Sequence, residues 1–405
     1  MKKFIAILLA MMLVLLNVAA LADEEPKTAN ILAENDKVGV TATPPVTLTI
    51  TKSFSTVGDT ALVPAHTIHF NVVPDHTTDP AGRTFPETLT IDPVTIVEGQ
   101  TSGDAAEGNI GAADLTIKLP AYTETGVYWY KVYETDEHVA GVTYTYPETA
   151  PLYLKVTVYN DNGTLKLGGV ALRPTADDGK TVDEETGEIS YDLTSKIDDV
   201  NNTYTAGELV IKKTVDGNMG DYTKDFVFDV TFTSKGYKYN ETTEVANEDG
   251  TTTTTTEEKT GNEMVKSTIT VKDTGKAGAK FNDAAITDKT VLSSDEWSGE
   301  KKVTVTLKHD QEVTFSNIPS DVTYTVVERD YASDGYTTED NSTGTDSKTD
   351  RTVNGTIASS KESAEFTNTK EETPDTGIAL ETLPFVLLMG IALVGVVALR
   401  RREEY

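Results

Sequence analysis

The sequence repeats itself, and this internal repeat limits the folds open to the chain more than any other feature. Three short segments occur between residues 44 and 205 and again, in the same order, between residues 206 and 370. Each copy carries a lysine in its first segment, a glutamate in its second and an asparagine in its third. Such self-similarity indicates two homologous domains. The matching segments are 48–54 and 209–215, 128–134 and 322–328, and 200–204 and 366–370.

The residues of both copies favour β-strands. Runs such as 152–159 and 226–232 alternate apolar and polar residues, and turn sequences such as Asp161-Asn162-Gly163 separate them. This alternation is typical of half-buried strands, and helical periodicity is almost absent. We therefore predict an all-β chain of two tandem β-sandwich domains, at 44–205 and 206–370. Polar stretches are expected to form a flexible lead-in at 23–43 and exposed loops at 251–256 and 339–350.

A lysine lies in phase with core-facing residues in both copies. Residues two apart share one face of a strand, so Lys52 lies on the apolar face of segment 48–54. Lys213 has the same place in segment 209–215, whereas Lys212 points the other way. Lysine is almost never fully buried without a partner, so a repeated inward lysine indicates a dedicated site.

The glutamates and asparagines follow the same rule. Each glutamate ends an inward-facing row, and each asparagine follows an inward apolar residue by two positions. In the first copy this phase favours Asn202 over its neighbour Asn201. We therefore expect each domain to enclose one residue of each type: Lys52, Glu134 and Asn202 in the first, and Lys213, Glu328 and Asn368 in the second.

These three residue types can react with one another when they are buried together. Burial raises the pKa of a carboxyl group and lowers the pKa of an amine, because both charged forms lose solvation. A neutral lysine is a nucleophile, and a protonated glutamic acid can polarise and protonate the asparagine amide. The product would be a lysine–asparagine amide bond, with ammonia released. The alternative is a buried ion pair with a hydrogen-bonded asparagine, which would stabilise a core poorly.

The N-terminus carries a predicted signal peptide, residues 1–22. Lys2 and Lys3 precede an apolar run at 4–18, and Ala20 and Ala22 form a small-residue cleavage site. The signal would direct export, and cleavage after Ala22 would leave Asp23 as the mature N-terminus. The alternative is an uncleaved N-terminal anchor.

The C-terminus carries a predicted sorting signal. Thr373, Pro374, Asp375, Thr376 and Gly377 precede an uncharged apolar stretch, and three arginines follow that stretch. This order resembles the sortase signal of wall-anchored Gram-positive proteins, although the usual leucine is Thr373 here. The alternative is an ordinary single-pass membrane protein. We predict the motif at 371–377, a transmembrane segment at 378–399 and a basic cytoplasmic tail at 400–405.

Composition excludes several classes of protein. The chain has no cysteine, so no disulfide reinforces it outside the cell. Its net charge of -30 argues against a nucleic-acid partner, which would need a basic face. His66 and His69 would point to opposite faces of a strand, and we find no phosphate loop or nucleophile elbow. We expect no metal, no cofactor and no enzyme of the turnover type.

Both copies resemble the streptococcal pilin isopeptide linker domains, the building blocks of sortase-assembled major pilins. The resemblance implies that both domains are immunoglobulin-like (CnaB-like) β-sandwiches in which a first-strand lysine (Lys52, Lys213) joins a last-strand asparagine (Asn202, Asn368). A glutamate on a central strand (Glu134, Glu328) assists.

The implied function is that of a pilus subunit. The C-terminal helix would hold the precursor in the membrane. A sortase would then cleave after Thr376 and join Thr376 to a lysine of an identical subunit. Lys196 is the best-placed acceptor, and Lys180 is the second candidate. In the alternative, Thr376 is joined once to peptidoglycan, and the chain is a monomeric adhesin or spacer. The sequence marks no site for a host surface ligand.

Overall fold

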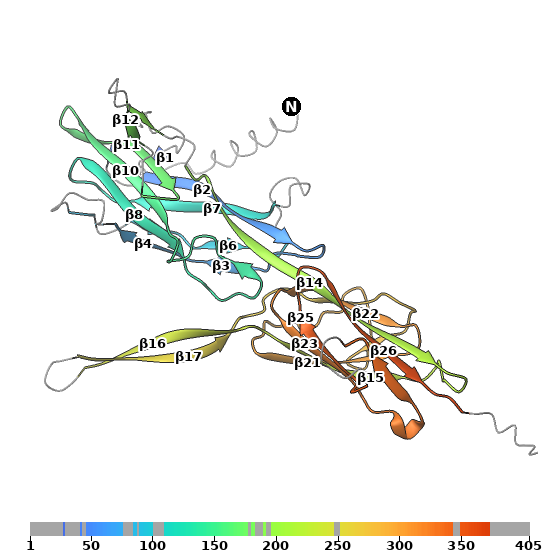
Figure 1. Ribbon diagram of the computed structural model, residues 1–405. Helices are drawn as coiled ribbons and strands as arrows, with labels where there is room; N and C mark the ends of the chain where they lie inside the picture. Colours follow the sequence, from blue (N-terminus) through green and yellow to red (C-terminus); the bar gives the residue numbers. More distant parts are fainter. Residues whose placement is uncertain are drawn as a thin grey trace, which may run out of the picture.

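The computed structural model describes residues 27–28, 41–42, 46–75, 84–86, 89–99, 109–176, 180–182, 189–191, 196–246, 252–342 and 349–372. Within these ranges the chain is built from β-strands, and the one helical element is a 3-10 turn, η3 (Ala332–Asp334). Two sandwiches lie end to end in an elongated molecule (Figure 1). The predicted all-β fold of two sandwiches is confirmed. The predicted signal peptide, the sorting residues 373–377 and the apolar C-terminal segment fall outside the described ranges. Among the residues that the structure describes, no helix is long and apolar enough to cross a membrane.

The first sandwich packs two sheets around one core. Alternate residues of β2 and β8 point inward, as their period-two sequence pattern requires. One sheet contains β1 (Lys27–Thr28), β2 (Val46–Val57), β5 (Thr90–Ile91), β7 (Asn109–Leu119), β9 (Val142–Thr143) and the start of β14 (Asp199–Asp216). The other runs β11 (Thr164–Arg173), β10 (Leu152–Asp161), β8 (Gly126–Glu134), β4 (Phe70–Pro74). Two short pairs complete the domain: β3 (His66–Ile68) with β6 (Val94–Ile96), and β12 (Lys180–Val182) with β13 (Ile189–Tyr191).

The second sandwich has the same two-layer plan around its own core. One layer contains β18 (Thr270–Asp273), β22 (Glu312–Pro319), the end of β14, β26 (Lys361–Thr369) and β24 (Thr337–Asp340). The other runs β20 (Ala284–Ala285), β19 (Lys280–Phe281), β21 (Glu300–Leu307), β15 (Phe226–Thr233), β23 (Thr323–Glu328), β25 (Thr352–Thr356).

Strand β14 belongs to both sandwiches. Residues 199–205 pair in parallel with β2, and residues 208–216 pair in parallel with β26. The strand thereby joins one layer of each sandwich into a single ten-stranded sheet (Figure 1). The predicted boundary between residues 205 and 206 therefore lies inside a continuous strand. Gly207 permits this close passage, because an added Cβ would lie 2.2 Å from the carbonyl oxygen of Ala358.

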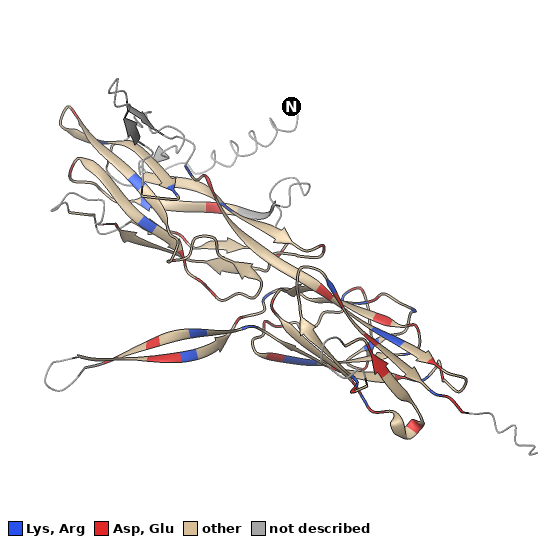
Figure 2. Cartoon of the chain, viewed as in Figure 1, with Lys and Arg blue, Asp and Glu red and all other residues tan. Residues whose placement is uncertain are grey.

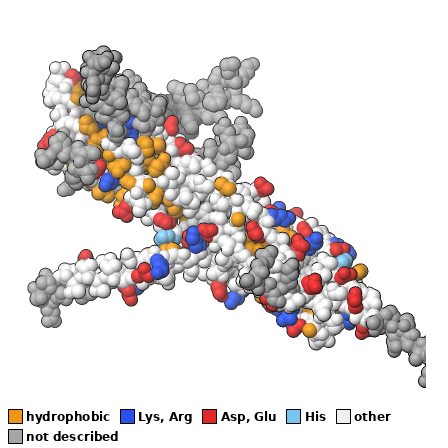
Figure 3. Space-filling view, viewed as in Figure 1, with side chains coloured by type: hydrophobic (Ala, Val, Ile, Leu, Met, Phe, Trp, Pro, Cys, Tyr) orange, Lys and Arg blue, Asp and Glu red, His pale blue; other side chains and the backbone are white. Residues whose placement is uncertain are grey.

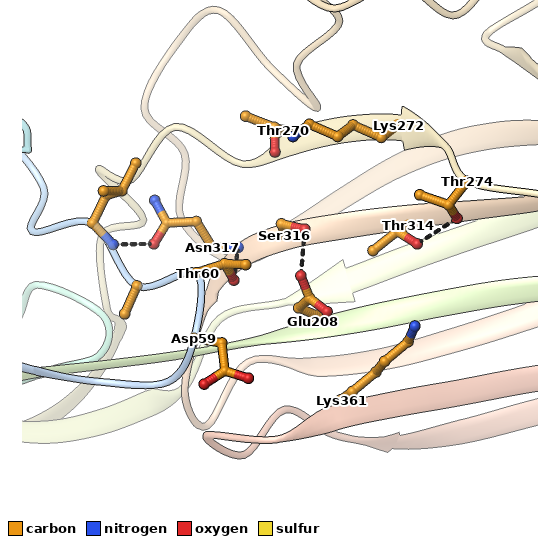
Figure 4. A pocket seen from close by; sticks show the side chains of 12 residues that line it. Asp59, Thr60, Glu208, Thr270, Lys272, Thr274, Thr314, Ser316, Asn317 and Lys361 are labelled. Atoms are coloured by element: carbon orange, nitrogen blue, oxygen red, sulfur yellow. Dashed lines mark hydrogen bonds between the residues drawn. The ribbon is translucent and has the colours of Figure 1, made fainter.

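Asn317 occupies the junction between the sandwiches. It has a left-handed backbone (φ 65°), is the extra residue of a β-bulge in β22 opposite Gly207 and Glu208 of β14, and is 1% exposed. Its Oδ1 accepts hydrogen bonds from the Leu62 amide (3.0 Å) and the Tyr204 hydroxyl (3.3 Å). Its Nδ2 donates to the Thr268 carbonyl (3.2 Å). One side chain thus connects a loop of the first sandwich, the shared strand and the second sandwich, at the end of a polar groove of about 550 Å³ (Figure 4).

A two-stranded ribbon projects from the second sandwich. It consists of β16 (Gly236–Ala246) and β17 (Thr252–Asn262), so the prediction of a loop at 251–256 is wrong for residues 252–256. Threonine is β-branched and favours extended structure even without a core to bury. Cross-strand ion pairs, Lys238–Glu258 and Lys259–Glu241, add support and appear as alternating red and blue bands in Figure 2. The ribbon forms a narrow arm of mostly polar surface, as Figure 3 shows.

The predicted loop at 339–350 is also partly wrong. Its first residues extend β24, which pairs with β26. Asp340 and Ser342 are buried there. The Ser342 amide donates a hydrogen bond to Asp340 Oδ1 at 3.0 Å. Of the predicted lead-in at 23–43, the described part includes β1, which pairs in parallel with β2, and buried Ala42.

Candidate isopeptide sites

Three strands bring Lys52, Glu134 and Asn202 into the core of the first sandwich. Lys52 is in β2, and its register partner in the neighbouring parallel strand β14 is Val200. Asn202 lies two residues further along β14, on the same face. Glu134 ends β8 in the opposite layer and reaches across the core. Lys52 and Asn202 are 0% exposed and Glu134 is 2% exposed.

One carboxylate oxygen contacts both partners in this site. Glu134 Oε1 lies 3.2 Å from Lys52 Nζ, and it accepts a hydrogen bond from Asn202 Nδ2 at 2.8 Å. Lys52 Nζ also donates to the Val200 carbonyl at 2.9 Å and lies over the Phe54 ring, 4.9 Å from its centroid. Glu134 Oε1 is therefore placed between the amine and the amide nitrogen.

Two consecutive backbone amides complete the first site. The Thr145 N–H donates to Asn202 Oδ1 (3.1 Å), and the Tyr146 N–H donates to Glu134 Oε2 (3.3 Å). The neighbouring Asn201 is only half-buried, and its Nδ2 donates to Ser53 Oγ (2.9 Å). The structure thus brings Asn202, rather than Asn201, together with the glutamate that contacts Lys52.

The second sandwich repeats this arrangement. Lys213 in β14 pairs in register with Phe366 of β26, and Asn368 lies two residues further on. Glu328 ends β23 in the opposite layer, and its Oε1 lies 2.9 Å from Lys213 Nζ. All three side chains are at most 1% exposed.

The second site differs from the first in how its acid and amide are held. The Thr338 hydroxyl, rather than a backbone amide, donates to Glu328 Oε2 (3.1 Å). Neither the oxygen nor the nitrogen of the Asn368 side chain forms a hydrogen bond within the described part of the chain. The Phe226 ring lies beside the amine, with its centroid 4.4 Å from Lys213 Nζ.

Burial changes the protonation of these groups. It lowers the pKa of both Lys52 and Lys213 to about 8, although the adjacent glutamate opposes the shift in each case. Burial raises the pKa of Glu328, against the opposing effect of Lys213. Each site therefore makes the uncharged amine more abundant near neutral pH than it is in an ordinary lysine, and places that amine beside an amide. A lysine with a pKa near 8 is a far better nucleophile at neutral pH than an ordinary lysine.

Sequence reasoning missed the donors that hold these groups. Thr145 and Tyr146 act through backbone N–H groups, so their side chains carry no sequence signal. Thr338 lies directly opposite Asn368 in β24, and strand pairing with β26 would have indicated it.

The remaining candidate residues lie elsewhere. Lys196 is half-buried immediately before β14, and Lys180 begins β12. His66 is buried with its Nδ1 2.8 Å from the Pro64 carbonyl oxygen, whereas exposed His69 lies 2.7 Å from Glu137 Oε1. The sorting residues 373–377 lie outside the described residues, which end at Glu372.

Known proteins resemble this chain over most of its length. The chain is 26% identical to a pilin of Streptococcus pyogenes serotype M1 over 364 residues, which cover 86% of this chain and 88% of the relative. The chain is similar to a streptococcal pilin. The resemblance predicted from the sequence is thereby confirmed over most of the chain's length. A family model described as a domain of unknown function (DUF7601) matches residues 207–274 and 261–370, in the second sandwich.

Solved pilin structures also match. The major pilin from Streptococcus pyogenes is 21% identical, with a TM-score of 0.46, and the match covers 81% of this chain and all of that one. The T-13 major pilin of the same species is 20% identical, with a TM-score of 0.40; that match covers 82% of this chain and 98% of the other.

Proposed function

We propose that this chain is a structural subunit of a sortase-assembled surface pilus and that each sandwich closes one internal amide bond, Lys52–Asn202 and Lys213–Asn368. One observation carries the proposal: the same lysine, glutamate and asparagine meet at the same register in both cores, fully buried. A duplicated buried ion pair alone would cost desolvation without stabilising the fold efficiently. The similarity to a streptococcal pilin supports the same conclusion.

The proposed reaction is a single self-modification in each domain. The neutral lysine Nζ attacks the asparagine Cγ, the Cγ–Nδ2 bond breaks, and Nδ2 leaves as ammonia. The glutamate carries the proton from the attacking nitrogen to the departing one. The fold holds all three groups in contact, so proximity supplies much of the rate. No substrate is turned over, so the chain acts as a structural protein rather than an enzyme.

Assembly would use the C-terminal motif. In the proposed sequence of events, a C-terminal membrane segment retains the precursor, a sortase cleaves between Thr376 and Gly377, and Thr376 is joined to a lysine of the next subunit. Lys196 is our candidate acceptor. Attachment of Thr376 to peptidoglycan would anchor the final subunit, or each subunit singly if the chain is a spacer.

Intact mass measurement tests the internal bonds. Recombinant residues 23–372 should be lighter than calculated by two ammonia molecules. Lys52→Ala and Lys213→Ala should each recover one. A wild-type chain of full calculated mass would overturn the proposed bonds.

Surface extracts from the native host test assembly. Wild-type cells should yield a ladder of covalent multimers, Thr376→Ala should abolish it, and Lys196→Arg should reduce it to monomers. Wall-bound monomers without a ladder in the wild type would favour the single-attachment spacer instead.

A further inference from the structure

We infer that the backbone N–H of Thr145 is the oxyanion donor of the first site, stabilising the negative charge that forms on Asn202 Oδ1 when Lys52 attacks. This inference rests on the proposed function, because it concerns how the Lys52–Asn202 bond forms. Preorganised donors aimed at a developing oxyanion are among the largest contributions to acyl-transfer rates.

The hydrogen bonds determine the orientation of the Asn202 amide. The Thr145 N–H lies 3.1 Å from one side-chain atom, which must be an oxygen because a donor requires an acceptor. The amide nitrogen then faces Glu134 Oε1 at 2.8 Å. The electrophile is thus polarised at its oxygen by a backbone amide. Its leaving nitrogen faces the group that can protonate it.

The segment that carries this donor is firmly held. β9 pairs with β14 at Thr203 and Tyr204, just beyond Asn202. The Thr145 hydroxyl donates to the Asn201 carbonyl at 2.5 Å, and the Tyr146 carbonyl accepts the Glu134 amide at 2.8 Å. The Thr145 side chain itself is exposed, so only its backbone reaches the buried site. The donor is in place before the reaction begins.

The reaction then balances within the site. Neutral Lys52 Nζ bonds to Asn202 Cγ, and the carbonyl electron pair moves to Oδ1, where the Thr145 N–H stabilises it. Glu134 Oε1 accepts a proton from Nζ and delivers a proton to Nδ2. The carbonyl re-forms, the Cγ–Nδ2 bond breaks and ammonia leaves. One C–N bond has formed and one has broken, without an oxidant or cofactor.

The second site serves as an internal control. Asn368 Oδ1 has no hydrogen-bond donor among the described residues, and Thr338 binds the acid instead. Formation of the Lys213–Asn368 bond should therefore be independent of Thr145. Comparing the two bonds in one molecule separates a local effect from a general folding defect.

The test replaces the Thr145 amide with an ester, by incorporating the α-hydroxy analogue of threonine during cell-free synthesis of residues 23–372. This change removes the N–H and keeps the side chain. An ester at Thr149, in the exposed turn that follows, controls for the ester linkage. After translation is stopped, mass spectrometry of cross-linked peptides follows each bond with time.

We expect the Thr145 ester to slow the Lys52–Asn202 bond about 100-fold. The Lys213–Asn368 bond in that molecule and both bonds of the Thr149 ester should keep the wild-type rate. A first-site rate within twofold of wild type would overturn the inference and leave the proposed function intact. Equal slowing of both bonds would also overturn it, since the effect would then be on folding. A wild-type chain that forms neither bond would overturn the proposed function itself.

Discussion

Asn368 lies two residues beyond Phe366, the register partner of Lys213 in the neighbouring parallel strand. Asn202 has the same offset from Lys52, whose register partner is Val200. The offset suits the chemistry, because a strand side chain leans along the strand and a long lysine reaches a diagonal neighbour more easily than a direct one. A glutamate from the opposite layer then reaches the pair from across the core.

Removing one glutamate should block one bond only. In Glu134→Ala or Glu328→Ala, no group remains to move the proton from the attacking amine to the leaving nitrogen. Intact mass should then show the loss of a single ammonia, and cross-linked peptides should identify the surviving bond in the other domain. Glu328→Gln, which conserves size, should behave like Glu328→Ala. Two bonds formed at the wild-type rate in Glu134→Ala would contradict the role assigned to the glutamate.

Losing the first bond should destabilise the first sandwich. Lys52 and Asn202 are 150 positions apart, and cross-linking a loop of that length restricts the unfolded chain by about 5 kcal/mol. Asn202→Ala should lower the free energy of unfolding by about that amount, measured by urea denaturation. It is a cleaner variant than Lys52→Ala, because it keeps the buried ion pair intact.

The adjacent Asn201→Ala is the matched control. It should form both bonds and lose little stability. If Asn201→Ala rather than Asn202→Ala abolished the bond, the strand register in solution would differ from the one described.

The rate of bond formation should depend on pH. Burial lowers the pKa of Lys52 from 10.5 to about 8, so the reactive uncharged amine becomes more abundant as the pH rises towards 8. Below that value each pH unit changes its fraction about tenfold. Newly translated protein should therefore close the first bond about ten times faster at pH 7 than at pH 6, with a plateau above about pH 8. A rate that instead falls above pH 8 would show that the glutamic acid must start protonated.

Asn317 should hold the two sandwiches in one orientation. Asn317→Gly keeps the left-handed backbone accessible but removes the contacts to Leu62, Tyr204 and Thr268. Because the chain has no cysteine, spin labels can be placed at Lys118→Cys and Lys302→Cys. The distance distribution between them should broaden in Asn317→Gly, while both internal bonds still form. An unchanged distribution would mean that β14 and the other contacts between the sandwiches, such as the Thr268–Glu98 hydrogen bonds, fix the orientation without Asn317.

The ribbon should be dispensable for folding. Replacing residues 238–260 with Asn-Gly leaves Tyr237 and Gly261, which are register partners, joined by a two-residue turn. It also keeps the stacking of Tyr237 on His138, whose ring centroids are 3.6 Å apart. The melting temperature and both bonds should be unchanged, because an exposed two-stranded ribbon contributes little stability. A large drop in melting temperature would show that the ribbon packs more extensively than the structure indicates.

Strand periodicity predicted the fold and selected the residues that meet in each core. It succeeded because lysine is rarely buried, so a lysine on the apolar face of a strand, such as Lys213, indicates a site. The same placement in both copies strengthened that indication. It could not predict the backbone donors of Thr145 and Tyr146, since every residue but proline has an N–H. The polarity of residues 252–256 led to the wrong prediction of a loop, because a threonine-rich segment can pair as a two-stranded ribbon without burying any apolar surface.

Strand β14 carries Asn202 of the first site and Lys213 of the second, 11 positions apart. In a pilus joined through Lys196 and Thr376, a pulling force would enter just before β14, run along β14 to Lys213 and cross the Lys213–Asn368 bond into β26. The roughly 150 residues inside the second loop would be bypassed, which conceals about 500 Å of contour length. The connecting piece of β14 is already extended and has almost no slack to release. Such a filament would behave as an inextensible tether that transmits a sudden load to its anchor instead of absorbing the load by unfolding.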